Sequence, residues 1–435
     1  MHHDSDGRFK LKIRHIILGV FAALLAAAIL YLALLGSGAN RRLEALRAAG
    51  QPTSLAELAL RNKLPMGMEN AAPIYESAFA AYVAPSEDVN VPYVSKQAKD
   101  PERGTRFSEP VAKVVTDYLA ANEVCLARLH EAAGIATCRY DYDYRQGYPR
   151  LSDLRFCVLL LKLAAVYHAN QGDGDAVVRC LEDTLRLGDS LEKEPMLIAY
   201  LVHIAGTAVA ISGFQSVLSI TSLTDSQLRD ADAAFAETDG KIDLAQALVG
   251  ERCYSIEYLR DPSLAGTAGP AAAILKSPGI KSRGIIDILD YMEDCIEAAG
   301  RPPVERLARF RQIEKRIQGL SFLHVAAKML APALSRVAEL DLRTHAHLDM
   351  ARTAVAIERY RLAEGRTPEQ LADLVPKYLE QVPSDPFDGQ PIRYRRAEPG
   401  YRLWSVMEDG KDNGGKEKEE VGKNEPYDLC FIVVK

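Results

Sequence analysis

A long uncharged apolar segment near the N-terminus constrains this chain most strongly. Residues 16–35 read IILGVFAALLAAAILYLALL and contain no charged side chain. A helix of 20 residues is about 30 Å long, which matches the hydrocarbon core of a bilayer. The segment therefore predicts a transmembrane helix. The alternative is a cleaved signal peptide, but the apolar run is longer than usual for one and no A-x-A cleavage site stands out.

Basic residues flank this segment on both sides. Four precede it and three follow it: Arg8, Lys10, Lys12 and Arg14, then Arg41, Arg42 and Arg47. Because positive charge favours the cytoplasmic side of a membrane, the small excess predicts a cytoplasmic N-terminus over residues 1–15. The bulk of the chain would then be periplasmic, in a single-pass protein of the inner membrane.

The composition is that of a folded protein rather than a nucleic-acid binder. Hydrophobic residues make up 48% of the 435 positions and charged residues 26%, which argues against a disordered chain. The formal net charge is −6, and there is one tryptophan. Nucleic-acid binding calls for a basic face or stacking aromatic side chains. We therefore expect membrane and protein partners and no nucleic acid.

Seven cysteines are spread through the chain without a C-x-x-C pair. This spacing argues against a zinc ribbon or a thioredoxin-type site. For most of them, a buried thiol acting as a small hydrophobic side chain is the better interpretation. Cys125 and Cys138 are candidates for a disulfide clip in an oxidising compartment. The odd total leaves at least one thiol unpaired.

Residues 40–340 predict an irregular helical domain. Between residues 151 and 218 apolar residues recur at spacings of three and four, and glycines at 172 and 174 divide this pattern into a hairpin. The hairpin resembles one tetratricopeptide-like unit, although no period of about 34 residues recurs. A capping box at Thr224–Gln227 predicts another helix start. Residues 261–284 contain four Gly and three Pro, which predicts a long loop or flap.

Tyrosines alternate with charged residues in the segment 139–150. Tyr140, Tyr142 and Tyr144 fall at every second position. This period of two is typical of an extended segment laid against the helices. We favour a loop anchored by tyrosine rings, and the alternative is an aromatic and acidic binding strip.

The C-terminal region has a different pattern. Residues 383–409 place Pro and Gly at short intervals, with apolar and aromatic residues between them. This pattern predicts turn, strand, turn and strand, followed by an acidic glycine-rich loop. Residues 427–434 predict a last strand, and residues 342–364 an amphipathic helix. The predicted fold class is thus mainly α, with a small α+β domain and an antiparallel sheet over residues 342–435.

Three motifs stand out in this region. They are Y-R-L-x-x-G-R-T-P at 360–368, P-x-D-P-F-x-G-x-P-x-x-Y at 383–394 and G-Y-x-L-W-S at 400–405. Together they resemble the soluble domain of the major pseudopilins of type II secretion, over roughly the last fifth of the chain. The middle region, with ENAAPIYESAF at 69–79, is similar to anchored helical envelope proteins of planctomycete-type bacteria.

The pseudopilin resemblance implies a long helix packed on a small antiparallel sheet, and a calcium site in the loop after the second strand. The matching residues are Asp409 and Asp412, with Asn413 as a further candidate. Calcium takes about six to eight oxygen ligands, which carboxylates and loop carbonyls can supply. The alternative is a solvated turn, in which Asp and Asn favour tight backbone geometry.

The chain departs from the pseudopilin pattern in its anchor. In that family the membrane helix is at the extreme N-terminus, is continuous with the soluble helix and carries a Glu that guides assembly. Here the anchor contains no Glu and lies some 300 residues before the helix at 342–364. We therefore expect a pseudopilin-like module grafted onto an anchored helical protein.

No catalytic motif is found in the sequence: G-x-S-x-G, H-E-x-x-H, Walker and G-x-G-x-x-G patterns are all missing. His203 lies in an apolar helical segment and is expected to be a hydrogen-bonded core residue. His345 and His347 are two residues apart, so a helix would point them to different faces. We therefore predict an interaction or scaffold protein, associated with a type II secretion or pilus-like system, with no catalytic residue.

Two alternatives stay open. The first is an envelope enzyme, a hydrolase with its site in the helical domain, which needs a deep pocket with converging titratable groups. The second is a receptor for a small ligand, with a mostly apolar pocket closed by residues 261–284. A scaffold instead needs a shallow groove or an apolar patch.

Overall fold

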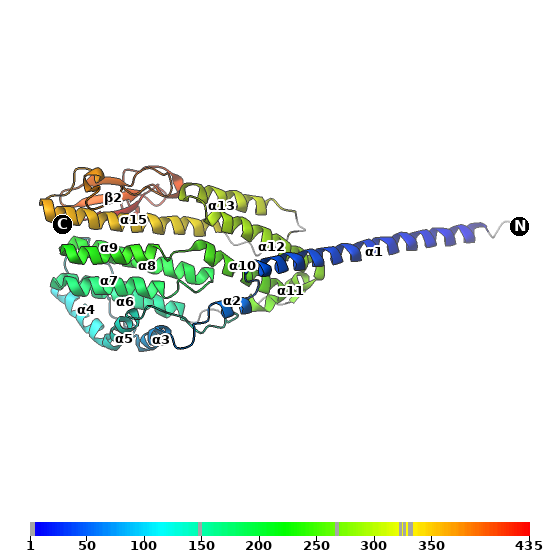
Figure 1. Cartoon of the computed structure of the whole chain (residues 1–435), viewed down its shortest axis with the longest axis horizontal. Coiled ribbons are helices and arrows are strands. Elements are labelled where there is room, and N and C mark those ends of the chain that lie inside the picture. The colour runs from blue at the N-terminus through cyan, green and yellow to red at the C-terminus, as the bar shows by residue number, and fades with distance from the viewer. Residues whose placement is uncertain (1–4, 147–149, 266–268, 322–323, 325–327, 329–333) are drawn as a thin grey trace. The chain divides into compact units, whose positions relative to one another are not determined.

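The structure is a computed structural model that describes residues 5–146, 150–265, 269–321, 324, 328 and 334–435. The fold is mainly helical, with a small antiparallel sheet near the C-terminus (Figure 1). The chain divides into two compact units. Unit 1 comprises Met1–Leu58, Arg252–Asp294 and Lys315–Pro332. Unit 2 comprises Ala59–Glu251, Cys295–Glu314 and Ala333–Lys435.

Unit 1 contains the N-terminal helix α1 (Ser5–Ala48), which includes the predicted anchor. Two helices among the described residues are long and apolar enough to cross a membrane: α1, and α8 (Leu197–Ile220) of unit 2. The apolar window of α1 is not buried at all, whereas 61% of that of α8 is buried. Phe21 of α1 is 67% exposed, for example. Helix α1 therefore exposes the apolar surface that a membrane anchor or a signal sequence needs.

The C-terminal part of α1 is fixed within unit 1. Arg42 forms ion pairs with Asp290 and Glu293 of α12 (Pro278–Ala299). On the same part of α1, Leu43 is 3% exposed. The helix thus changes along its length from an exposed apolar segment to one that is packed against the folded unit.

The predicted loop or flap over residues 261–284 is wrong for the described part of this segment. The segment contains the 3-10 helix η1 (Pro262–Ala265), the helix α11 (Gly269–Lys276) and the start of α12. Residues 266–268 lie outside the described residues. Proline is tolerated in a first helical turn because the N–H that it lacks has no intrahelical acceptor there. Two of the prolines that suggested a loop stand at helix starts.

Unit 2 is built on helices that lie side by side in the cyan and green part of Figure 1. Helix α6 packs on α7 and α8, and α7 packs on α9. The helices are α3 (Ala72–Ala81), α4 (Glu109–Ala121), α5 (Glu123–Ala133), α6 (Leu151–Gln171), α7 (Gly174–Asp189), α8 and α9 (Asp225–Asp239). The helices α2 (Leu55–Arg61), α10 (Leu244–Arg260), α12 and α13 (Pro303–Gln318) each contribute residues to both units.

Glycine and capping residues set the limits of these helices. Helix α6 ends at Gly172, whose φ of 77° lies in the left-handed region that glycine adopts without strain. Asp173 then caps α7 by accepting a hydrogen bond from the backbone N–H of Ala176. Thr224 and Gln227 form a capping box at the start of α9. The predicted hairpin and the predicted start of α9 are confirmed.

The loop anchored by tyrosine rings is confirmed for its described part. Residues 139–146 form neither helix nor strand, and residues 147–149 lie outside the described residues. Tyr140 and Tyr144 are buried, and the ring of Tyr140 stacks on that of Tyr142 with centroids 5.1 Å apart. Burial of these rings holds the segment on the helices without a regular backbone ladder.

The strands predicted near the C-terminus are confirmed. They form one antiparallel sheet in the order β1 (Arg393–Arg396), β2 (Tyr401–Ser405) and β3 (Leu429–Val433). Tyr401 lies opposite Val433 in the register of β2 and β3. Gly400 precedes β2 with a φ of 111°, and a Cβ at this position would lie 1.9 Å from the carbonyl oxygen of Val433. Only glycine fits this turn.

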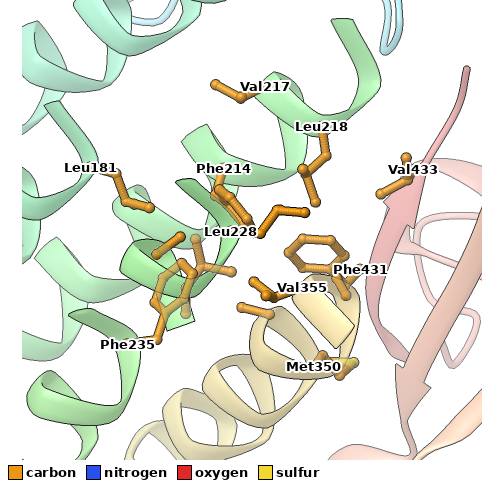
Figure 2. Packing of buried hydrophobic residues seen from close by; sticks show 14 of the residues in the cluster. Leu181, Phe214, Val217, Leu218, Leu228, Phe235, Met350, Val355, Phe431 and Val433 are labelled. Atoms are coloured by element: carbon orange, nitrogen blue, oxygen red, sulfur yellow. The ribbon is translucent and has the colours of Figure 1, made fainter. Parts of the chain in front are cut away.

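The sheet shares a hydrophobic core with α15 (Leu334–Glu364) and the helices of unit 2. Figure 2 shows Phe431 of β3 and Val355 of α15 near Phe214 of α8 and Phe235 of α9. All four side chains are buried, and full burial of one such side chain contributes roughly 1.5–3 kcal/mol. The sheet is therefore stabilised by helices far from it in sequence.

The predicted domain boundary near residue 342 does not separate two compact bodies. Helix α15 begins at Leu334, before that boundary, and residues 342–435 belong to the same unit as residues 59–251. A sheet with one apolar face needs another layer to cover it. Helices α8 and α15 both contact β3 and provide that layer.

Candidate functional site

A polar cavity of about 430 Å³ lies in unit 2. Its walls come from residues 61–65 and 68 at the end of α2 and just after it, residues 135–139 after α5, several residues between 186 and 193 at the end of α7, and Glu237 and Lys241 at the end of α9. Tyr75 of α3 also lines it. The volume falls in the range of small-ligand pockets.

Two asparagines connect the walls of this cavity. The side-chain amide of Asn62 donates a 2.8 Å hydrogen bond to the carbonyl of Lys193 and a 3.2 Å bond to the hydroxyl of Tyr144. The side chain of Asn70 bonds both backbone groups of Arg139, donating to its carbonyl and accepting from its N–H, each at 2.9 Å. These contacts give the cavity its shape without a ligand.

One lining residue, Asp189, is a buried carboxylate whose side chain is 7% exposed. Its Oδ1 lies 2.9 Å from Nε2 of His203, and its Oδ2 accepts hydrogen bonds from Thr238 at 3.1 Å and Lys241 at 2.9 Å. Burial alone would raise the pKa of Asp189, but the bonds and charges of His203 and Lys241 outweigh it and lower the pKa. Asp189 is therefore ionised at neutral pH. The prediction of His203 as a hydrogen-bonded core residue is confirmed.

The thiol and hydroxyl groups of the cavity are in poor states for nucleophilic attack. Burial raises the pKa of Cys138 to about 12, so this thiol is protonated at neutral pH. The hydroxyl of Ser190 donates a 2.7 Å hydrogen bond to the carbonyl of Leu187 and lies 3.0 Å from the hydroxyl of Tyr140. The cavity is better suited to hold a ligand than to attack one.

Cationic side chains outnumber carboxylates in this cavity by six to three. The cations are Arg61, Lys63, Arg139, Arg186, Lys193 and Lys241, and the carboxylates are Asp189, Glu192 and Glu237. A positive excess in a concave site attracts anions more strongly than the same charges do on a flat surface.

A second cavity, of about 350 Å³ in unit 1, is acidic, but its carboxylates have partners. Asp287 pairs with Arg283 at 3.0 Å and with His324 at 2.8 Å. Asp294 pairs with Arg316, and the two remaining acidic residues pair with Arg42 of α1. These ion pairs are sufficient to explain the cluster as part of the packing of unit 1.

No disulfide links the seven cysteines, all of which belong to the described residues. The sequence suggests Cys138 as the partner of Cys125. In the structure the sulfur of Cys125 lies 3.9 Å from that of Cys157, and both thiols are buried. The two come from α5 and α6 and lie in one hydrophobic cluster.

The loop after β2 holds the predicted calcium residues, and each has a hydrogen-bonding role. Asp409 accepts a 3.0 Å bond from the N–H of Lys411. Asp412 accepts bonds from the indole of Trp404 at 2.9 Å and from the N–H of Gly414 at 2.8 Å. These contacts order the turn without a metal.

Asn413 contributes to the same loop through a carboxylate that the sequence analysis missed. Its backbone N–H and side-chain amide both donate to Asp428, at 3.0 Å and 3.3 Å. Asp428 is 2% exposed and also accepts from the N–H of Gly415 at 2.7 Å. The signal in the sequence is a single acidic residue just before the last strand, which is too common to be informative.

The donor set fits calcium poorly as it is arranged. Within the described part of the chain, no group of three or more His, Cys, Asp or Glu side chains is placed to hold a metal. The second oxygen of Asp412 lies 4.0 Å from the guanidinium of Arg393, which would repel a cation. Calcium binding therefore stays a prediction of the resemblance, and we derive no role for it.

The hydrogen bonds within this loop predict that adding calcium leaves the Tm of the full chain unchanged, whereas the resemblance predicts a rise. A ligand at a hundredfold excess over its Kd stabilises by about 2.7 kcal/mol, which would raise the Tm by several degrees. Differential scanning fluorimetry with millimolar calcium or with a chelator measures this. A calcium-dependent rise that disappears in Asp409→Ala and Asp412→Ala would establish the site.

The sequence did not single out the basic cavity. Its charged residues are spread from Arg61 to Lys241 and follow no motif spacing. These charged residues line one cavity because α2, α5, α7 and α9 end near one another. Each residue taken alone looks like an ordinary solvated charge.

Comparison of this chain with protein-family models, with curated proteins and with solved structures gives no match.

Proposed function

We propose that this chain is a membrane-anchored protein whose folded part lies outside the cytoplasm and binds other molecules there. The main support for the proposal is that the exposure of apolar side chains changes along α1. Its large apolar side chains between Leu18 and Leu34 are exposed, whereas Leu43 is buried in unit 1. A helix with this exposed surface is stable in a bilayer and costly in water.

The proposed orientation follows from the charges around the apolar segment. Basic residues are slightly more numerous before it than after it, which favours a cytoplasmic N-terminus. Helix α8 is mostly buried in the protein, so α1 is the single span in this proposal. The folded part would then be periplasmic, at the inner membrane.

An association with a type II secretion or pilus-like system is the specific form of the proposal. It is supported by the three motifs that resemble major pseudopilins, because their residues hold the sheet together. Asp385 is fully buried, pairs with Arg393 at 2.7 Å and accepts a 2.9 Å bond from the N–H of Val406. The tetratricopeptide-like hairpin of α6 and α7 adds a helical surface of a kind that binds other chains.

Binding is favoured over hydrolysis by the groups in the basic cavity. The thiol of Cys138 is protonated, and Asp189 is already bound by three donors. The receptor alternative was expected to have an apolar pocket closed by residues 261–284. The cavity is instead highly charged.

Replacing Leu24 and Leu25 with lysine is expected to release the full chain from membranes. A lysine near the middle of a span costs about 2.5–3.5 kcal/mol of insertion free energy. The measurement is the fraction of the chain that stays in the membrane pellet after an alkaline carbonate wash. The wild-type chain should stay in the pellet, and alkaline phosphatase fused after Lys435 should be active if that end is exported.

The matched control replaces Leu60 and Met66, which are 68% and 103% exposed outside the anchor, with lysine. This control should stay with the membrane. A wild-type chain that is soluble and shortened at its N-terminus by mass spectrometry would instead show that the segment is a cleaved signal.

A further inference from the structure

We propose that the basic cavity of unit 2 binds a small anion carrying two or more negative charges on phosphate or carboxylate groups. This inference does not depend on the membrane anchor, because every residue that lines the cavity belongs to unit 2. The proposed function names no ligand for this cavity, and the inference adds a ligand class.

The charge of the cavity is opposite to that of the chain. Its lining has three more cationic than anionic side chains, while the whole chain has a net charge of −6. Like charges gathered in one concave site repel each other, and a bound anion relieves that repulsion. The excess is therefore a local feature of this site and not a reflection of an overall basic protein.

Half of the cations are already neutralised by the cavity's own carboxylates. Lys241 bonds Asp189 at 2.9 Å and Glu237 at 2.7 Å. Arg186 lies 3.9 Å from Glu237, and Lys193 pairs with its neighbour Glu192. These pairs account for all three carboxylates of the lining.

The other three cations have no ion pair with any described residue. Arg61 and Lys63 are exposed at the end of α2 and just after it. The guanidinium of Arg139 donates a 2.6 Å hydrogen bond to the carbonyl of Cys138, which carries no charge. Three charged donors, coming from two different walls, thus face one cavity and leave room for a multiply charged ligand.

The backbone around these donors is already in place. The main chain of Arg139 is held at both its N–H and its carbonyl by Asn70, and Asn62 bonds the carbonyl of Lys193. Next to the bonds between Asn70 and Arg139, the backbone N–H of Ala71 also donates to the carbonyl of Thr137 at 2.9 Å. A preformed site costs less ordering on binding. The ligand also has to be small, because the cavity holds only about 430 Å³.

The test uses the full chain in detergent, with pyrophosphate and citrate as separate probes and glucose as a neutral control. Isothermal titration calorimetry should show saturable binding of at least one of the two anions and none of glucose. Raising the salt concentration from about 0.05 M to about 0.3 M should weaken binding, because it screens the charges. Binding of pyrophosphate alone would indicate phosphate ligands, and binding of citrate alone carboxylate ligands.

The double variant Arg61→Ala/Lys63→Ala should weaken binding at least about tenfold, because charged hydrogen bonds to the ligand are lost. The matched control is Lys96→Ala/Lys99→Ala, which removes the same charge from two exposed lysines outside the cavity. It should bind as the wild type does. Arg139→Ala, tested alone, keeps the inference testable if the double variant is unstable, and Tm values identify misfolding. Equal affinity in all variants, or no saturable binding of either anion, would overturn the inference.

Discussion

Replacing Gly250 with alanine is expected to lower the free energy of unfolding of unit 2 by more than about 3 kcal/mol. Gly250 lies in α10, and a Cβ there would be 1.5 Å from the carbonyl oxygen of Pro195 and 2.5 Å from its carbonyl carbon. Both contacts are with backbone atoms, so no side chain can rotate away. The helix would have to move off the segment that leads into α8. Overpacking typically costs about 1–3 kcal/mol. A separation of 1.5 Å is far shorter than a van der Waals contact, so we expect the cost here to exceed that range.

Urea unfolding of the full chain in detergent, followed by far-ultraviolet circular dichroism, measures the effect. The matched control is Gly240→Ala, where the new Cβ would meet its nearest atom, the carbonyl oxygen of Glu237, at 3.6 Å. Gly240 has a φ of −66°, so alanine fits and the change should be within about 1 kcal/mol. Alanine also favours helices over glycine by about 1 kcal/mol. A Gly250 variant that is as stable as the wild type would therefore show that α10 does not approach Pro195 so closely.

Local features of the fold were predictable because they depend on neighbouring residues. Each of these features is encoded in a short stretch of neighbouring residues. Examples are the apolar segment 16–35, the hairpin at Gly172 and the capping box of Thr224 and Gln227. The strands after residue 390 were predictable for the same reason, since Pro and Gly occur at short intervals in the turns around them.

Prolines caused the main local error, over residues 261–284. The same residue type breaks a helix interior and starts a helix at its first turn. Composition alone cannot distinguish these two uses. The segment also contains apolar residues that pack in unit 1 and so favour a helix over a loop. Leu275, for example, is 1% exposed.

The cavity and the shared core were beyond sequence reasoning because both depend on long-range packing. Phe431 of β3 meets Phe214 of α8 only after the sheet has docked on the helices (Figure 2). Similarly, Arg61 and Lys241 line one cavity although 180 positions separate them. A pattern that repeats every two or four residues contains no information on such pairs.

A buried carboxylate, Asp341 of α15, joins three other parts of unit 2. It is 1% exposed and accepts hydrogen bonds from the hydroxyl of Tyr200 and from Arg306 at 2.6 Å. Nε2 of His345 lies 3.6 Å from it, and Nδ1 of His345 lies 2.7 Å from Asp239. Burial would raise the pKa of Asp341, but His345 and Arg306 together lower it. The cluster is thus a network in which Asp341 has both a hydroxyl and a cationic partner, and His345 links it to Asp239.

Replacing Asp341 with alanine is expected to lower the free energy of unfolding by about 3–5 kcal/mol, because Arg306, whose side chain is only 15% exposed, would lose its ion pair. The same urea assay measures it. Asp117→Ala is the matched control, since its ion pair with Lys113 is exposed and such pairs contribute at most about 1 kcal/mol. Equal losses in the two variants would contradict a special role for the buried network.

The pH dependence of stability provides an independent test of the same network. Burial alone would lower the pKa of His345, but its hydrogen bonds with Asp239 and Asp341 raise the pKa to about 10. In the unfolded chain a histidine titrates near about 6.5. The protonated form is therefore favoured by folding, so this contribution is complete below about pH 6.5 and is lost as the pH rises toward 10. We expect the stability of the wild-type chain to fall across this interval. In Asp341→Ala the fall should be smaller, because one of the two carboxylates that hold the proton is gone. An identical slope in both proteins would show that Asp341 does not help to hold this proton.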